Sequence, residues 1–260
     1  MNLSVRVRKF YIYRAVLWEM SLKKLKAKYC GSFLGIWWAL LLPVILAAAI
    51  NLVFSQVFER GERHFSLFLL SGLLPWFFFS NSLNDAVGSF TGNVSEVRQN
   101  IFPREIIPLS YTISDFMNFM AGLLVLLPLF LVFVPGSVVF LPLLLLVLIL
   151  FFIFTAGLGL IFSSLNVFFR DLEHIMQVGM MIWFWLTPVF YSIDRFSEPL
   201  KSLAQLNPVM PYIVSFQKIL FKGMAPSVPE ISLCFIFALF FFSTGYLLFL
   251  KNEPELLKRI

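Results

Sequence analysis

Charge and cysteine are both scarce in this chain. Of its 260 residues, 13% are charged and 60% are hydrophobic, and there are only two cysteines and two histidines. Cys30 precedes the first long apolar run and Cys234 lies within the last, so we expect neither a disulfide between them nor a metal site. A soluble domain does not need so much apolar side chain. The mean hydropathy of +0.88 therefore indicates an integral membrane protein.

Motifs for catalysis and for energy coupling are also missing. The sequence has no GxxxxGK[ST] phosphate loop, so we expect no ATP or Mg²⁺ site in this chain. Its apolar runs lack the series of ionisable residues that a proton- or sodium-coupled carrier needs, because Asp85 and Asp115 are the only acids inside them. We interpret both as helix-packing or near-interface residues. No catalytic set stands out, so the chain is predicted not to be an enzyme, and energy must come from another subunit.

The sequence has many apolar runs of about 20 residues. As helices, such runs are long enough to cross a hydrocarbon core of roughly 30 Å. They occur at 35–58, 65–90, 106–134, 137–166, 175–193 and 231–250. We predict one all-α membrane domain over 1–260, with an interfacial helix and turn at 1–34, a six-span core at 35–250 and a tail at 251–260. Pro128 and Pro142 are expected to bend their helices.

Lysine and arginine are distributed unequally between the two sides of this topology. Fourteen of the 20 fall in segments that share a side with the termini, and six fall on the other side. The positive-inside rule therefore places both termini in the cytoplasm. This bias accounts for most of the formal charge of +6, so no nucleic-acid partner is predicted. The first apolar run begins after Leu34 and is of spanning length, so we expect no cleavable signal peptide.

Residues 10–29 have the pattern of an amphipathic helix. A mainly apolar stripe recurs at helical spacing, and Arg14, Lys23, Lys24 and Lys28 lie off it. Such a helix lies among membrane lipids in the cytoplasmic headgroup layer. It can be an anchor, or its basic face can meet an anionic lipid headgroup such as a diphosphate.

A sharp turn follows, and it carries two glycines and two tryptophans. Gly31 and Gly35 allow the chain to turn into the first span, and Trp37 and Trp38 fit the interfacial aromatic belt. The same residues, with Tyr29, would also suit the mouth of a glycan pathway. The sequence does not separate these alternatives.

Three tryptophans near the middle of spans do not fit the interfacial belt: Trp76, Trp183 and Trp185. Aromatic faces can stack on the C–H faces of sugar rings, and the alternative is packing among phenylalanines. We hypothesise that at least one of Trp183 and Trp185 faces a channel.

Three connecting segments have patterns of their own. Between the fourth and fifth runs, charge is confined to a turn containing Arg170 and Asp171. In the segment after the second run, Asn93 or Ser95 can cap a short helix that ends before Pro103, which can be a docking helix or an ordinary loop. The external segment 192–230 holds an apolar stretch too short to cross, so two short re-entrant or interfacial helices are expected there.

Several motifs occur together, in one order, across nearly the whole chain. They are LGIW at 34–37 with Pro43, LPWFFFS at 74–80, FP at 102–103 with PL at 108–109, LNVFFRD at 165–171, TPVFY at 187–191 and NP at 207–208. The set resembles the membrane subunit of ABC-2-type exporters, in particular the permeases that export O-antigen, teichoic acid and capsular polysaccharides.

The resemblance implies a homodimer bound to two copies of a separate ATPase subunit, which holds ATP and Mg²⁺. The cargo would be a polysaccharide on an undecaprenyl diphosphate type of lipid, moved across the bacterial inner (plasma) membrane. Coupling to the ATPase would involve the helix at 94–102 and the Arg170 turn, through Val94, Ser95, Glu96, Arg98, Phe102, Arg170 and Asp171. The entrance and channel would involve Tyr29, Leu34, Gly35, Trp37, Trp38, Trp76, Trp183, Trp185 and Tyr191.

Two other functions remain open from the sequence. An ABC-2 exporter of a drug or another lipid would use the same architecture. A membrane enzyme of lipid-linked sugar metabolism would need clustered acids or histidines near the cytoplasmic face, for which only Asp171, Glu173 and His174 are present.

Overall fold

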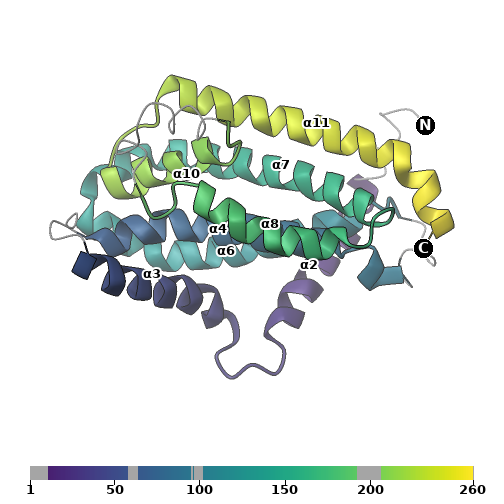
Figure 1. Cartoon of the computed structure of the whole chain (residues 1–260), viewed down its shortest axis with the longest axis horizontal. Coiled ribbons are helices and arrows are strands. Elements are labelled where there is room, and N and C mark those ends of the chain that lie inside the picture. The colour runs from purple at the N-terminus through teal and green to yellow at the C-terminus, as the bar shows by residue number, and fades with distance from the viewer. Residues whose placement is uncertain (1–10, 58–63, 95, 97–101, 192–205, 260) are drawn as a thin grey trace.

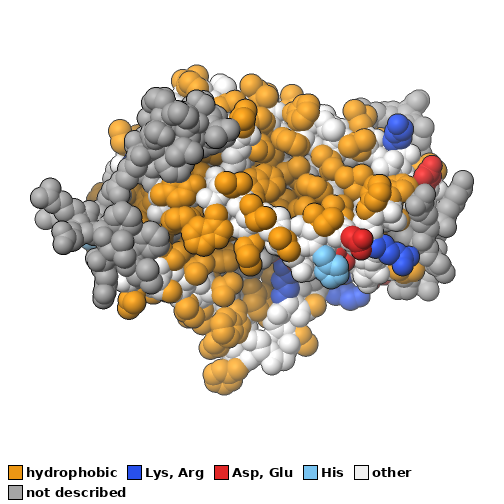
Figure 2. Space-filling view, in the orientation of Figure 1, with side chains coloured by type: hydrophobic (Ala, Val, Ile, Leu, Met, Phe, Trp, Pro, Cys, Tyr) orange, Lys and Arg blue, Asp and Glu red, His pale blue; other side chains and the backbone are white. Residues whose placement is uncertain are grey.

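The computed structural model describes residues 11–57, 64–94, 96, 102–191 and 206–259. Within these ranges the chain forms helices and turns and no strand, as the all-α prediction requires. Most helices run along the long axis of the molecule (Figure 1). One face is hydrophobic over its middle, with charged side chains gathered toward one end (Figure 2), as expected where a lipid bilayer surrounds the protein.

Four helical segments are long and apolar enough to cross a membrane. They are α4 (Phe65–Val87), α6 (Ile106–Phe133), the turn η3 (Pro135–Phe140) with α7 (Leu141–Asn166), and α11 (Val228–Arg259). α7 packs along α11, while α4 contacts both α6 and α7. α4 is the most buried of the four, so it forms the centre of this bundle. The chain is thus a multi-pass membrane protein.

The first and fifth predicted spans are also helical, and the fifth is shorter than a membrane-crossing helix. α3 (Trp38–Val57) follows the turn η1 (Gly35–Trp37), and its apolar described part is Leu40–Ile50. α8 (Leu172–Leu186) has 15 residues, about 22 Å of helix. It ends well before residue 193, because Thr187 is extended ahead of Pro188. Six crossings therefore remain a prediction.

The prolines act differently at their two positions. Pro128 lies inside α6, where a bend was expected. Pro142 was expected to bend its span as well, but it occupies the first turn of α7. A proline there removes an N–H that has no partner within the helix, so it starts the helix rather than bending it.

An aromatic cluster joins the bundle to a short helix, α10 (Met210–Gln217). The rings of Phe151 and Phe154 each lie 5.0 Å from that of Tyr212, and Phe79 stacks on Phe154 at 5.8 Å. The π-helical turn η5 (Lys218–Lys222) extends α10 and ends at Gly223. Part of the predicted external segment is therefore a short, buried helix. The rest, 192–205, lies outside the described residues.

α7 and α11 approach most closely where glycines face each other. A Cβ on Gly245 would lie 2.2 Å from the carbonyl oxygen of Gly157, and one on Gly157 would lie 2.5 Å from backbone atoms of Phe242. Small residues at such a crossing let two membrane helices touch through their backbones.

Candidate functional site

The interfacial helix α2 (Arg14–Tyr29) packs on α6 and then leads away from the bundle into the turn before α3 (Figure 1). Gly31 and Gly35 have φ angles of +77° and +51° in this turn. Glycine adopts such angles without steric cost, so the prediction that these two residues make the turn is confirmed.

Lys28, at the end of α2, binds two carboxylates from two spans. Its Nζ lies 2.6 Å from a carboxylate oxygen of Asp85 on α4 and also donates a hydrogen bond to Asp115 on α6. The Asp115 side chain is only 1% exposed, against 28% for Lys28. Burial alone would lower the pKa of Lys28, but the charges of Asp115 and then Asp85 raise it above its usual value, so it stays protonated. We call these three residues the Lys28 cluster.

The sequence did not predict this cluster. The two acids were interpreted singly, as packing or near-interface residues, although they come together on one lysine. The available signal was that isolated acids within apolar runs need a counter-ion and that α2 supplies several lysines.

Two further lysines of α2 contact the start of the predicted docking segment. Lys24 donates hydrogen bonds to Asn93 at 2.6 Å and to the Tyr111 hydroxyl at 2.9 Å. Lys23 lies 3.5 Å from Glu96 in a more exposed pair. Lys24 and Lys28 therefore face the protein, which leaves less of the helix's charge for a lipid headgroup than the basic-face hypothesis assumed.

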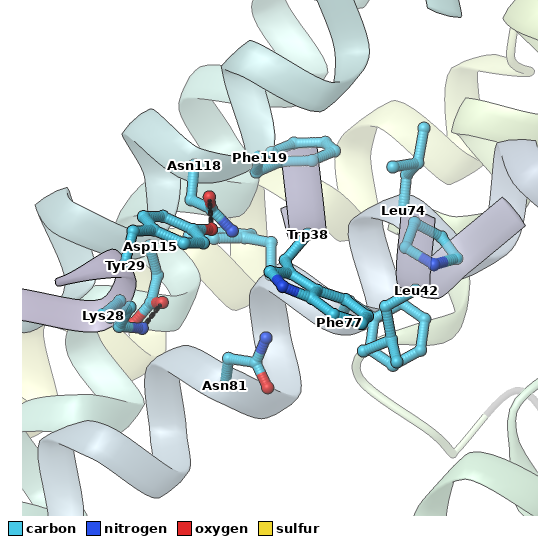
Figure 3. A pocket seen from close by; sticks show the side chains of 12 residues that line it. Lys28, Tyr29, Trp38, Leu42, Leu74, Phe77, Asn81, Asp115, Asn118 and Phe119 are labelled. Atoms are coloured by element: carbon cyan, nitrogen blue, oxygen red, sulfur yellow. Dashed lines mark hydrogen bonds and ion pairs between the residues drawn. The ribbon is translucent and has the colours of Figure 1, made fainter. Parts of the chain in front are cut away.

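A pocket of about 200 Å³ lies beside the Lys28 cluster, between the end of α2 and helices α3, α4 and α6 (Figure 3). Tyr29 forms part of its wall and donates a hydrogen bond to the side-chain amide oxygen of Asn118. Burial raises the pKa of the Tyr29 phenol, which keeps its proton available for that bond. Trp38, Phe77 and Asn81 complete much of the lining.

The predicted entrance residues lie together around this turn. Tyr29 and Trp38 line the pocket, and Leu34 and Gly35 are half-buried in the turn itself. Trp37 is 57% exposed and lies at the end of η1, beside Trp38.

The other predicted channel residues lie around α8, apart from this pocket. Trp76 is buried between Phe79 and Phe184, and Trp183 packs edge-on against Phe79. Trp185, in contrast, is 59% exposed. Tyr191 donates a hydrogen bond from its hydroxyl to the backbone carbonyl of Trp185 at 3.1 Å. Of the three mid-span tryptophans, only Trp185 is open to another molecule.

Asn207 connects the end of α8 to the start of α10. Its side-chain oxygen accepts hydrogen bonds from Trp183 Nε1 at 2.9 Å and from the backbone N–H of Val209 at 3.1 Å. Its amide nitrogen donates to Thr187 Oγ1 at 2.9 Å. The TPVFY and NP motifs therefore form one structural unit, which their separation in the sequence did not predict.

The described part of the predicted coupling region is divided between surface and core. Val94 is exposed, Glu96 is paired with Lys23, and Phe102 packs against a small apolar cluster of Phe90, Ile107, Leu160, Phe249 and Leu256. Ser95 and Arg98 lie outside the described residues. Arg170 and Asp171 are both exposed on the turn between α7 and α8.

The described residues contain no group of three His, Cys, Asp or Glu side chains that could bind a metal ion.

The pattern of the ABC-2 type transporter family matches residues 15–221, most of the chain. The chain belongs to the ABC-2 type transporter family. The resemblance inferred from the six motif groups is thereby confirmed.

The similarity to named relatives covers most of this chain and most of each relative. The protein is 29% identical over 225 residues to an O-antigen export system permease protein RfbA of Klebsiella pneumoniae, with 86% of each chain covered. It is 31% identical over 222 residues to the RfbA of Myxococcus xanthus, with 85% of each covered. A polysialic acid transport protein KpsM of Escherichia coli is 20% identical over 258 residues, 95% of this chain and 97% of that one.

Proposed function

We propose that this chain is the membrane permease of an ATP-driven exporter that moves a lipid-linked polysaccharide out of the cytoplasm across the bacterial inner membrane. The main support for this proposal is the family match, together with about 30% identity to permeases named for O-antigen export along most of their length. The cargo is proposed to travel on an undecaprenyl diphosphate type of lipid.

The proposed topology has six crossings, with α3 and α8 as the first and fifth. α8 supports this, because one side of it is apolar and exposed in the protomer: Ile175, Val178, Met181, Ile182, Trp185 and Leu186. Both termini are then cytoplasmic, as the distribution of lysine and arginine favours.

Two copies of the chain are proposed to form the channel. The exposed side of α8 suits contact with a second copy or with cargo. Trp185 would then contact the moving glycan.

Two copies of a separate ATPase subunit, holding ATP and Mg²⁺, are proposed to dock on the cytoplasmic side. The segment 94–102 and the exposed Arg170 turn are the proposed docking surface. α2 supports a role in coupling, because it contacts Glu96 through Lys23 at one point and forms the pocket wall through Tyr29 at another.

The test is ATP hydrolysis by the permease co-purified with its ATPase subunit, with and without lipid-linked polysaccharide. Stimulation by the glycan-lipid, and not by drugs or short lipids, is the expected result. Stimulation by drugs or short lipids alone would point to a different ABC-2 cargo. If no ATPase subunit co-purifies, the exporter proposal fails.

A further inference from the structure

The pocket beside the Lys28 cluster contains hydrogen-bonding groups that are available to a ligand. Asn81 is the only exposed residue of α4, the most buried span, and it lines this pocket. The amide nitrogen of Asn118 also has no hydrogen-bond partner among the described residues, since only its oxygen is engaged, by Tyr29. Polar side chains that face a pocket beside membrane spans can hydrogen-bond to a molecule that enters it, so this pair is available to a ligand.

The pocket combines these amides with aromatic faces. Figure 3 shows Asn81 reaching from α4 and Asn118 from α6 toward the same space, beside Trp38. An asparagine amide can both donate and accept hydrogen bonds, which matches a hydroxyl group. Aromatic rings can cover the C–H face of a sugar. Together they provide the chemistry that binds a ring bearing several hydroxyl groups.

The charge in the pocket disfavours an anionic ligand. Lys28 is the only cation among the described residues that line it, and both Asp85 and Asp115 already bind that ammonium group. A diphosphate placed there would gain no free positive charge and would be repelled by the carboxylates. The charge therefore favours a neutral ligand over an anionic one.

Size limits the ligand further. Pockets for drug-sized molecules have volumes of about 300–1,000 Å³, and this pocket has about 200 Å³. The pocket therefore suits a group smaller than a drug-sized molecule, such as one sugar ring.

We propose that this pocket binds one neutral sugar ring, held by the amides of Asn81 and Asn118 against Trp38. The inference rests on the proposed function and deepens it, because it assigns recognition of a sugar, rather than of the diphosphate, to the turn region. The ring can come from the carrier-linked glycan or from a neutral glycolipid of the surrounding bilayer.

The test uses the permease with its ATPase subunit in lipid nanodiscs, with a photoreactive phenylalanine at Leu42, which lines the pocket and is half-exposed. A second version carries the probe at Met181 on the exposed side of α8. The ligands are undecaprenyl diphosphate alone, the same carrier with one neutral hexose, and the carrier with the full polysaccharide.

We expect the Leu42 probe to label both sugar-bearing carriers and not the sugarless one. Asn81→Leu and Asn118→Leu should each reduce that labelling about tenfold, the effect of losing one well-formed hydrogen bond. Asn84→Leu, a matched change on α4 outside the pocket lining, should leave it unchanged. Competition by a monohexosyl diacylglycerol would assign the site to bilayer glycolipid as well, and lack of competition would assign it to the carrier-linked glycan alone.

Equal labelling by the sugarless carrier would overturn the inference, since the pocket would then bind lipid or diphosphate. Polysaccharide labelling at Met181 with none at Leu42 would overturn it while leaving the proposed function intact. Absence of labelling at both positions, with no stimulation of ATP hydrolysis, would count against both.

Discussion

Lys28 connects the interfacial helix to the membrane core through a single side chain. It reaches from α2 to Asp85 on α4 and Asp115 on α6, so three elements depend on one ammonium group. A carboxylate as buried as that of Asp115 is tolerated in a membrane protein because this lysine neutralises it.

Lys28→Met should therefore destabilise the protein, because it leaves two acids near each other without a counter-ion. We expect a loss of about 2 kcal/mol, less than for a fully buried pair, since the lysine is partly exposed. The measurement is the thermal unfolding midpoint in detergent. Lys26→Met on an exposed position of the same helix is the matched control. Adding Asp85→Asn and Asp115→Asn to Lys28→Met should restore much of the stability, and failure of that rescue would mean that the cluster does not fix α2.

At the scale of elements, the contact of α7 with α11 depends on two glycines. Gly245→Ala would place a methyl group against the Gly157 carbonyl, where neither atom can move without shifting a helix. We expect a loss of about 3 kcal/mol in stability, at the upper end of the cost of over-packing. The matched control is Gly179→Ala on α8, where a Cβ meets nothing within 4 Å. It should be neutral or up to about 1 kcal/mol stabilising in the protomer. A Gly245→Ala protein as stable as the control would contradict the close crossing.

The whole molecule determines which tryptophans can act on cargo. Trp185→Ala should reduce glycan export several-fold, with little change in protomer stability, because the side chain is mainly exposed. Trp183→Ala should instead lower the unfolding midpoint by several degrees, because it removes the hydrogen bond to Asn207 and the contact with Phe79. Export and thermal stability measured on both variants check this separation. Normal export by the stably folded Trp185→Ala protein would argue against its place in the channel.

Coupling is also a property of the whole assembly. Arg170 is exposed at the turn between α7 and α8, and in the described part of the chain it forms no ion pair with Asp171 or Glu173. If this turn meets the ATPase subunit, Arg170→Ala should leave folding and ATP hydrolysis largely intact while reducing transport per ATP several-fold. The ratio of export to ATP hydrolysis measures the effect, with Arg170→Lys as the variant that keeps the charge. An unchanged ratio would favour a purely topological role for the residue.

The class of this protein can be predicted from its sequence. Apolar length and the scarcity of charge predict a helical membrane protein, because a bilayer leaves the backbone few other ways to satisfy its hydrogen bonds. The helices α4, α6 and α7 lie close to their predicted limits. A local feature of the backbone was also predicted correctly, because Gly31 and Gly35 make the expected turn. The order of motifs identified the family.

Which residues meet depends on how the helices pack. Lys28 and Asp115 are 87 residues apart, and Trp183 and Asn207 are 24 apart, so no periodicity within one element relates them. The early end of α8 before Pro188 and the place of Pro142 in the first turn of α7 are instead local effects of proline, which hydropathy does not register. Hydropathy predicts that a segment is buried in a membrane, but it has the same value whether the segment faces lipid, another helix or cargo. The separation of Trp185 from Trp76 and Trp183 therefore required the packing of α8 on α4.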